Sequence, residues 1–356
     1  MDDHAACSRS RAPAFAARRG LLSRGDRMRV LVIGAAGMIG RKLVHRLASD
    51  GALGHEPILS MLLADVVPAS EVTNPGSVGI ETAVADLAQP GVVRELLAGR
   101  PDVIFDLAAV VSGEAETDFQ KGYRVNLDAT RCLLDAVRAV GGGYRPRLVF
   151  SSSIAVFGPP FAEVIDDQQA STPATSYGTQ KAIVELLLSD YTRRGFLDGV
   201  AIRLPTICVR PGMPNLAATG FFSNIIREPL DGRAAVLPVS VDARHWFASP
   251  RSAVRFLVHA ATLESELIGP RRSLTMPGVS ATVAMQIESL RRAAGDGAVA
   301  LIRHEPDEAI ARMVDGWPRA FDALRAHELG FRAESDFDEI VRVHIEDELG
   351  GVIKFS

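Results

Sequence analysis

The chain has 356 residues, 47% hydrophobic and 23% charged, which is the composition of an ordinary globular protein. Its 39 basic and 43 acidic residues leave a net charge of -4, so charge alone favours neither nucleic acid nor an anionic membrane as a partner. No apolar run approaches the roughly 18 residues that span a bilayer, and three scattered cysteines without metal-ligand spacing, Cys7, Cys132 and Cys208, predict a cytoplasmic protein without disulfides or a metal site.

Residues 1–27 differ in composition from the rest of the chain. They contain six arginines and three aspartates but no apolar periodicity. The aspartates argue against a transit peptide, and no continuous apolar segment resembles a secretion signal. We therefore expect a disordered N-terminal extension, with Met28 as the functional start.

A buried strand is predicted at residues 29–33, because this run is short, apolar and continuous. Gly34, Gly37 and Gly40 follow it at once, and a helix is predicted from Arg41. Glycines in this strand–turn–helix context allow a close approach of the backbone, so that amides at the helix start can hold a pyrophosphate. A glycine-rich turn that binds no ligand is the alternative.

Two further strands are predicted to end in acids. Residues 58–65 end at Asp65, whose carboxylate can accept both ribose hydroxyls of NAD and would repel a 2′-phosphate. Residues 82–87 contain Asp86, which either faces the adenine or caps the segment from Leu87 onward. A structural role as a strand-end cap is the alternative for Asp65 as well.

The alternation of strands and helices continues to about residue 205. Residues 102–109 read as a strand that ends in the small pair Ala108 and Ala109, and a helix over residues 118–140 contains Asn126. Residues 147–150 form the next strand, which leads directly into Ser151–Ser153. This pattern predicts an α/β fold of the Rossmann type, a doubly wound parallel sheet that binds its ligands at the carboxyl ends of the strands.

Tyr177 and Lys181 lie four residues apart in a helix predicted over residues 176–194, so they occupy one face one turn apart. A phenol with a reference pKa of about 10 needs a shift of roughly three units, about 4 kcal/mol, to act as a base near neutrality. An ammonium roughly 4 Å away, at an effective dielectric constant of about 20, supplies that much. The pair therefore has the chemistry of a tyrosinate base, although the same spacing also arises by chance on surface helices.

The second half is less regular. After a strand at residues 200–205, residues 210–238 are rich in proline, glycine and arginine and are predicted to form a loop region that covers a substrate. We expect residues 206–356 to form a smaller mixed lobe without a complete sheet, interleaved with the nucleotide-binding domain of residues 28–205. Helices are predicted at residues 252–263, 282–294, 306–314, 318–328 and 337–348.

Taken together, these motifs resemble the extended short-chain dehydrogenases/reductases. The resemblance implies that Ser153 hydrogen-bonds the reacting oxygen, that Tyr177 is the proton acceptor, and that Lys181 lowers the pKa of Tyr177 and binds the nicotinamide ribose. The other residues that it assigns to the cofactor, NAD, are Gly34, Gly37, Met38, Ile39, Gly40, Asp65, Asp86, Leu87, Ala108 and Asn126.

Two departures from the family pattern narrow the reaction. Sugar-nucleotide dehydratases of this family have an Asp-Glu pair directly after the catalytic hydroxyl residue, where this chain has Ile154 and Ala155. Dehydration is therefore disfavoured. Phe157 stands where many epimerases have tyrosine.

The second half resembles a subgroup, the D-erythronate dehydrogenases, in the stretches 203–212, 221–230 and 244–250. This resemblance implies NAD-dependent oxidation of the C2 hydroxyl of a four-carbon sugar acid, and related enzymes are commonly homodimers. Arginines offer forked donors for a carboxylate, and we expect Arg210 and Arg244 to bind the substrate, although most arginines of this region have surface roles. The alternatives are a nucleotide-sugar 4-epimerase, another sugar-acid or uronate dehydrogenase, and an NAD-sensing protein with an inactive site.

Overall fold

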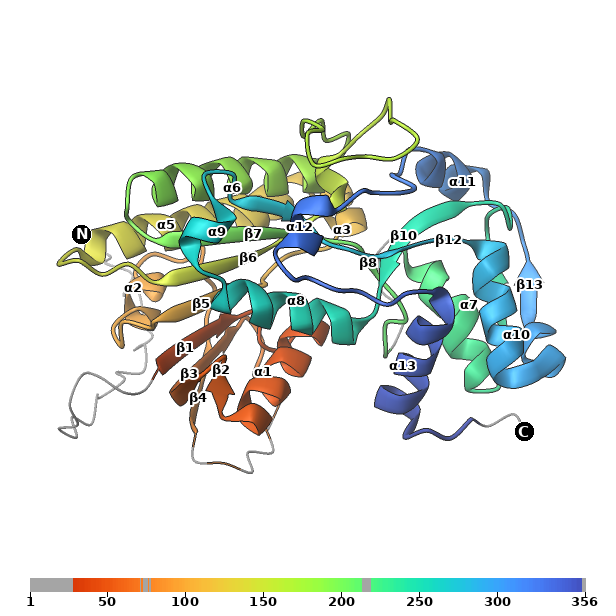
Figure 1. Ribbon diagram of the computed structural model, residues 1–356, viewed down its shortest axis with the longest axis horizontal. Helices are drawn as coiled ribbons and strands as arrows, with labels where there is room; N and C mark the ends of the chain where they lie inside the picture. Colours follow the sequence, from red (N-terminus) through yellow and green to blue (C-terminus); the bar gives the residue numbers. More distant parts are fainter. Residues whose placement is uncertain (1–27, 71, 73–75, 77, 213–218, 354–356) are drawn as a thin grey trace, which may run out of the picture.

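The computed structural model describes residues 28–70, 72, 76, 78–212 and 219–353. The predicted N-terminal extension lies outside this part of the chain. Figure 1 shows a sheet with helices on both faces at one end of the molecule and a smaller lobe of helices and short strands at the other.

The central sheet is parallel and confirms the predicted α/β fold. Its strand order is β4-β3-β1-β5-β6-β7-β11, with β2 paired antiparallel to β3 at one edge. The chain runs outward from β1 and then returns to β5 on the other side of β1, which creates a topological switch point. The strands are β1 (Met28–Ile33), β2 (Ala52–Leu53), β3 (Glu56–Asp65), β4 (Gly79–Val84), β5 (Val103–Asp106), β6 (Arg147–Ser153), β7 (Asp198–Leu204) and β11 (Ser273–Thr275).

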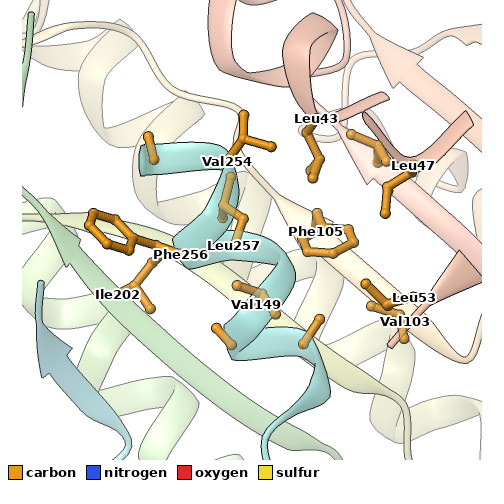
Figure 2. Packing of buried hydrophobic residues seen from close by; sticks show 14 of the residues in the cluster. Leu43, Leu47, Leu53, Val103, Phe105, Val149, Ile202, Val254, Phe256 and Leu257 are labelled. Carbon is orange, nitrogen blue, oxygen red and sulfur yellow. The ribbon is translucent and has the colours of Figure 1, made fainter. Parts of the chain in front are cut away.

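Two helices from opposite halves of the chain cover one face of this sheet. Helix α1 (Met38–Asp50) contributes Leu43 and Leu47, and α8 (Pro250–Thr262) contributes Val254 and Leu257. Figure 2 shows these side chains gathered around Phe105 of β5. The second half of the chain thus completes the core of the first, through α8 and through β11 at the sheet edge.

The other face is covered mainly by α5 (Ala129–Val140) and α6 (Ser176–Arg193), whose leucines pack against the sheet. The remaining helices of this part are short. They are α2 (Val92–Leu96), α3 (Ser112–Thr117), α4 (Phe119–Tyr123), α9 (Ser265–Ile268) and α12 (Leu324–Glu328), together with the π-helical turn η1 (Arg124–Asp128) and the 3₁₀ turn η2 (Ile154–Val156).

The smaller lobe has more regular structure than the sequence predicted. Three short strands pair in the order β12-β10-β8, and β9 pairs with β13. Its core joins Phe222, Phe247, Leu290 and Ile340. The elements are β8 (Thr206–Ile207), α7 (Gly220–Leu230), β9 (Ala235–Leu237), β10 (Arg244–Ala248), β12 (Val279–Thr282), α10 (Val283–Val299), β13 (Ile302–His304), α11 (Glu308–Asp315) and α13 (Phe337–Leu349).

Two predictions for this lobe were wrong. The expected loop over residues 210–238 contains α7 and β9, because the apolar side chains of α7 pack into the lobe core. The helix predicted over residues 318–328 exists only as α12, because Phe321 pairs with Ile165 in an isolated bridge and holds the preceding segment extended.

Among the described residues, no helix has the length and hydropathy required to cross a membrane. The same residues contain no cluster of three or more histidine, cysteine or acidic side chains arranged to hold a metal ion.

Candidate active site

A cavity of about 480 Å³ lies at the carboxyl ends of the central strands and extends to the smaller lobe. It is lined by three groups of residues, which come from segments far apart in the sequence. These are the glycine turn after β1, the end of β6 with the start of α6, and a wall formed by Thr206, Ile207, Arg210, Thr219, Asn224, Arg227, His245 and Trp317.

The glycine turn is shaped by close backbone contacts. Gly34 has a φ of 82°, and a Cβ at this position would lie 2.7 Å from the amide nitrogen of Ala108. A Cβ at Gly40 would lie 2.1 Å from the carbonyl oxygen of Gly34. Both positions therefore require glycine, which explains the motif in steric terms.

The start of α1 fits a pyrophosphate. Gly37 is the N-cap residue and supplies no side-chain cap to the helix. Gly37, Met38, Ile39 and Gly40 line the cavity. Because first-turn amides have no intrahelical acceptor and carry the positive end of the helix dipole, they suit a bound anion.

The acids predicted to bind the cofactor, Asp65 and Asp86, are not among the residues that line the cavity. Asp65 accepts a hydrogen bond from the Ala36 amide at 2.9 Å, so it also braces the glycine turn. Asp86 is paired with Arg124 at 2.7 Å and accepts from the Ala88 amide at 3.0 Å. Leu87 is buried. Leu107 and Ala109 line the cavity, whereas Ala108, between them, does not.

Asn126 has a structural position within the π-helical turn η1, which interrupts the single helix predicted over residues 118–140. Its Oδ1 accepts from the Val110 amide at 2.9 Å, and its Nδ2 donates to the Val110 carbonyl and to Gln180. Asn126 therefore ties the loop after β5 to α6 and does not line the cavity itself.

Ser153 is the last residue of β6, and its Oγ accepts from the Ala155 amide at 3.1 Å. The neighbouring Ser152 donates to the buried Glu185, which forms a two-pronged ion pair with Arg203. Since side chains alternate along a strand, this arrangement separates a structural serine from the one beside Tyr177.

Helix α6 begins directly against the turn that follows Ser153. Thr175 is its N-cap and accepts from the Gly178 amide at 3.0 Å. A Cβ at Gly178 would lie 2.1 Å from the Ala155 carbonyl oxygen, so the first turn of α6 rests on the η2 turn. This contact places Tyr177 next to Ser153, which hydrogen-bonds it.

Lys181 lies fully buried behind Tyr177. Its Nζ donates to the Ser151 carbonyl at 2.8 Å and lies 5.6 Å from the centre of the Tyr177 ring. Burial lowers the pKa of Lys181 to about 8, against the opposing influence of Asp106 and Glu185.

The pKa of Tyr177 is raised above its ordinary value. Burial is the largest cause, and it is only partly offset by the charge of Arg210 and the hydrogen bond with Ser153. The prediction that Lys181 alone brings this phenol towards neutrality is therefore wrong for the protein's own groups, because the ammonium contacts a carbonyl and the ring rather than the phenol oxygen.

Among the residues that the structure describes, Arg210 is one of three cations that line the cavity, with Lys181 and Arg227. Its Nε donates to the Ile207 carbonyl at 3.0 Å and its Nη2 donates to Thr219 at 3.1 Å. Within the described part of the chain, no carboxylate pairs with it, whereas Arg227 is paired with Glu228. Arg210 thus retains donor capacity for an acidic ligand.

Arg244 does not join Arg210. It is exposed on β10, does not line the cavity, and donates to Ser280 on the neighbouring strand. The next residue, His245, lines the cavity and was missed. Alternation along the strand held the signal for this difference, because adjacent residues point to opposite faces.

The profile described as "NAD dependent epimerase/dehydratase family" matches residues 30–269. The chain is 45% identical to a D-erythronate dehydrogenase from Cupriavidus necator, over 90% of this chain and 98% of that protein. It is 39% identical to a D-erythronate dehydrogenase from Haemophilus influenzae, over 90% of this chain and 100% of that protein.

A crystal structure described as a nucleoside-diphosphate-sugar epimerase from Agrobacterium tumefaciens is also similar. It shares 59% sequence identity, with a TM-score of 0.90, and the match covers 96% of this chain and 99% of that one.

Proposed function

The chain belongs to the NAD-dependent epimerase/dehydratase family and is an NAD-dependent oxidoreductase, and on that premise we propose that it oxidises the C2 hydroxyl of the four-carbon sugar acid D-erythronate to a 2-oxo acid. The observation that carries the proposal is the position of Arg210. Its guanidinium opens onto the same cavity as Ser153 and Tyr177 and has no carboxylate partner among the described residues. A carboxylate is the group that such a forked cation binds best.

In this proposal each residue acts at a defined atom. Arg210 binds the substrate carboxylate, Ser153 hydrogen-bonds the C2 oxygen, and Tyr177 takes the C2 hydroxyl proton. Lys181 supplies positive charge behind Tyr177 and binds the nicotinamide ribose. Bound NAD⁺ supplies the acceptor for the hydride that leaves C2.

The glycine turn and Asp65 keep the cofactor roles that the sequence indicated, as proposals, whereas Asp86, Leu87, Ala108 and Asn126 are given a supporting role in place of the predicted contact with the cofactor. The turn from Gly34 to Gly40, with Met38 and Ile39, holds the pyrophosphate through backbone amides. Asp65 favours NAD over NADP because its charge would repel a 2′-phosphate. Asp86, Leu87, Ala108 and Asn126 support the pocket from behind, since their contacts are with the protein itself.

The relatives support a sugar acid as the substrate. Two relatives that this chain matches over nearly their full length are named D-erythronate dehydrogenases. The similar crystal structure described as an epimerase keeps a nucleotide sugar as the second candidate, because an arginine also binds phosphate. Another sugar acid or a uronate on the same fold is the nearest variant of the first proposal.

The test is a screen of NAD⁺ reduction across three- to six-carbon aldonates and uronates, with nucleotide sugars measured in parallel by product analysis. We expect NADH with D-erythronate and a loss of at least roughly 100-fold in Tyr177→Phe, the usual range for a missing acid or base. Interconversion of a nucleotide sugar without net NADH, and no turnover of any acid, would establish the epimerase instead.

The arginines provide a matched pair of variants. Arg210→Met is expected to raise KM for the acid by roughly 10- to 100-fold, because a charged hydrogen bond contributes about 1.5–3 kcal/mol. Arg244→Met is expected to leave kcat and KM within about twofold, since that side chain is exposed and bonds only to Ser280. Equal losses in both variants would remove the carboxylate role from Arg210.

We also propose a homodimer and a cytoplasmic location. Exposed apolar side chains on adjacent helices, Phe119 on α4 and Leu186 on α6, support the dimer. Sedimentation of the purified protein tests it, and a monomer at working concentration would contradict it.

A further inference from the structure

Thr206 and His245 form a hydrogen-bonded pair in the wall of the cavity. The Thr206 Oγ lies 2.6 Å from His245 Nε2, and His245 Nδ1 lies 2.9 Å from the carbonyl oxygen of Pro318. A carbonyl only accepts hydrogen bonds, so Nδ1 must carry a proton. In the hydrogen bond between His245 and Pro318, His245 is therefore the donor.

His245 carries only that one proton. His245 is 2% exposed, and its ring is stacked parallel to the Phe222 ring with 5.5 Å between the ring centroids. Phe247 and Trp317 also contact the imidazole ring. Burial lowers the pKa of His245 to about 4, against the opposing effect of the hydrogen bond that His245 donates to the Pro318 carbonyl, and the charge of Arg210 lowers it further. With Nδ1 protonated and the ring neutral, Nε2 is an acceptor, and the Thr206 hydroxyl must donate to it.

Thr206 then offers the cavity only lone pairs. Its hydrogen is engaged with His245, so the Oγ can accept a hydrogen bond from a ligand but cannot donate one. Arg210, in contrast, has only donors, and it lies close enough to act electrostatically on both Tyr177 and His245. The wall therefore presents donors for an acid group and, next to them, an acceptor for an O–H group.

We propose that Thr206 accepts a hydrogen bond from a second substrate hydroxyl, beyond C2, so that the enzyme selects polyhydroxy acids over simple 2-hydroxy acids. His245 is the positioning residue that fixes the Thr206 hydroxyl in its accepting orientation. This inference rests on the proposed oxidation of a sugar acid and specifies how that site recognises the rest of the molecule.

The test compares two acids of equal chain length, D-erythronate and the 2-hydroxybutyrate of the same C2 configuration, which keeps the carboxylate and the C2 hydroxyl but lacks the others. In the wild type we expect kcat/KM to favour D-erythronate by roughly 10-fold or more, because a site built to bond a hydroxyl rejects an analogue without it. Thr206→Val should lower kcat/KM for D-erythronate alone and bring the ratio close to one. Thr206→Ser should retain the ratio.

Thr219→Val is the matched control. It removes a hydroxyl from the same cavity, but that hydroxyl accepts from Arg210, so both acids should weaken alike and the ratio should persist. His245→Phe keeps the contact with Phe222 and frees the Thr206 hydrogen, so it should reduce the ratio with Thr206 intact. This variant keeps the inference testable if Thr206→Val does not fold.

Each outcome has a distinct meaning. A Thr206→Val enzyme that slows with both acids in proportion, at an unchanged ratio, overturns the inference, as does a ¹⁵N spectrum in which His245 carries its proton on Nε2. A wild-type enzyme that reduces NAD⁺ with neither acid overturns the proposed function instead, and that failure is visible before any variant is made.

Discussion

Two cations lie near Tyr177, and they act on it differently. The Lys181 ammonium donates to the Ser151 carbonyl, whereas the charge of Arg210 lowers the pKa of the phenol directly. Burial outweighs both Arg210 and Ser153, so the protein's own groups hold the pKa of Tyr177 above its ordinary value. At neutral pH the unassisted base is therefore protonated.

This balance predicts a titration. A difference spectrum between the wild type and Tyr177→Phe, recorded without NAD, should show no tyrosinate below about pH 10, the reference value of the phenol. Because the ionised fraction of a base rises with pH up to its pKa, kcat/KM should rise by up to about tenfold per unit across the neutral range. Arg210→Met should move the tyrosinate signal to still higher pH. A tyrosinate signal already present at pH 7 in the protein alone would contradict this account.

The individual site residues that could be predicted from the sequence are those that lie next to a recognisable strand or helix. Ser153, Tyr177, Lys181 and the glycine turn each follow or begin an element whose pattern is visible in the chain. The pair of Thr206 and His245 could not be predicted in this way, because their contact is created by the pairing of β8 with β10. The one local signal was the alternation of side chains along β10, which places His245 and not Arg244 on the side of the cavity.

Among the elements, the contact between α6 and the η2 turn has the clearest catalytic consequence. Gly178→Ala would place a Cβ 2.1 Å from the Ala155 carbonyl oxygen, so the first turn of α6 must move away from Ser153. A displacement of about 1 Å costs roughly 100-fold in rate when groups must be aligned, and we expect kcat/KM to fall by about that factor. NAD affinity should stay within a few-fold, because the glycine turn after β1 is unchanged.

Gly99→Ala is the control for this variant. A Cβ at Gly99 would meet nothing within 4 Å, so the substitution should leave kcat/KM unchanged and raise the free energy of unfolding by about 0.4–1 kcal/mol. The measurements are steady-state kinetics and an NAD titration on both variants. A Gly178→Ala enzyme with full activity, or one that loses NAD binding and rate together, would show that this contact does not position Tyr177.

The elements differ in how far their own sequences specify them. The longer strands of the central sheet have apolar patterns that identify them, and they were predicted, whereas β2 and β11, with two and three residues, were not. The small sheet is built from strands of two to five residues, β8, β10 and β12. They are too short to be recognised as strands from their sequence pattern alone, and they depend on each other for pairing. The π-helical turn at Arg124–Asp128 is a local insertion within a helical pattern, and periodicity does not reveal it.

On the scale of the whole molecule, the two parts are built into each other. Helix α8 and strand β11 belong to the core of the central sheet, yet they follow α7 and β10 of the smaller lobe in the chain. Ion pairs also tie α13 to the other part, from Lys42 on α1 to Glu348 and from Arg251 on α8 to Asp347. The aromatic contacts of Phe321 with Phe157 and Trp246 join residues from both halves.

This interleaving predicts one cooperative unfolding transition. Both tryptophans, Trp246 and Trp317, come from the second half of the chain, so their fluorescence reports on that region, while far-UV circular dichroism reports on all helices. The two melting curves should coincide. NAD⁺ at about 100 times its Kd contributes roughly 2.7 kcal/mol to the folded state and should move both curves together by roughly 5 °C. Gly40→Ala, which crowds the Gly34 carbonyl, should remove the shift with NAD⁺ while the curves still coincide. A tryptophan transition that comes first and ignores NAD⁺ would mean that the smaller lobe unfolds independently.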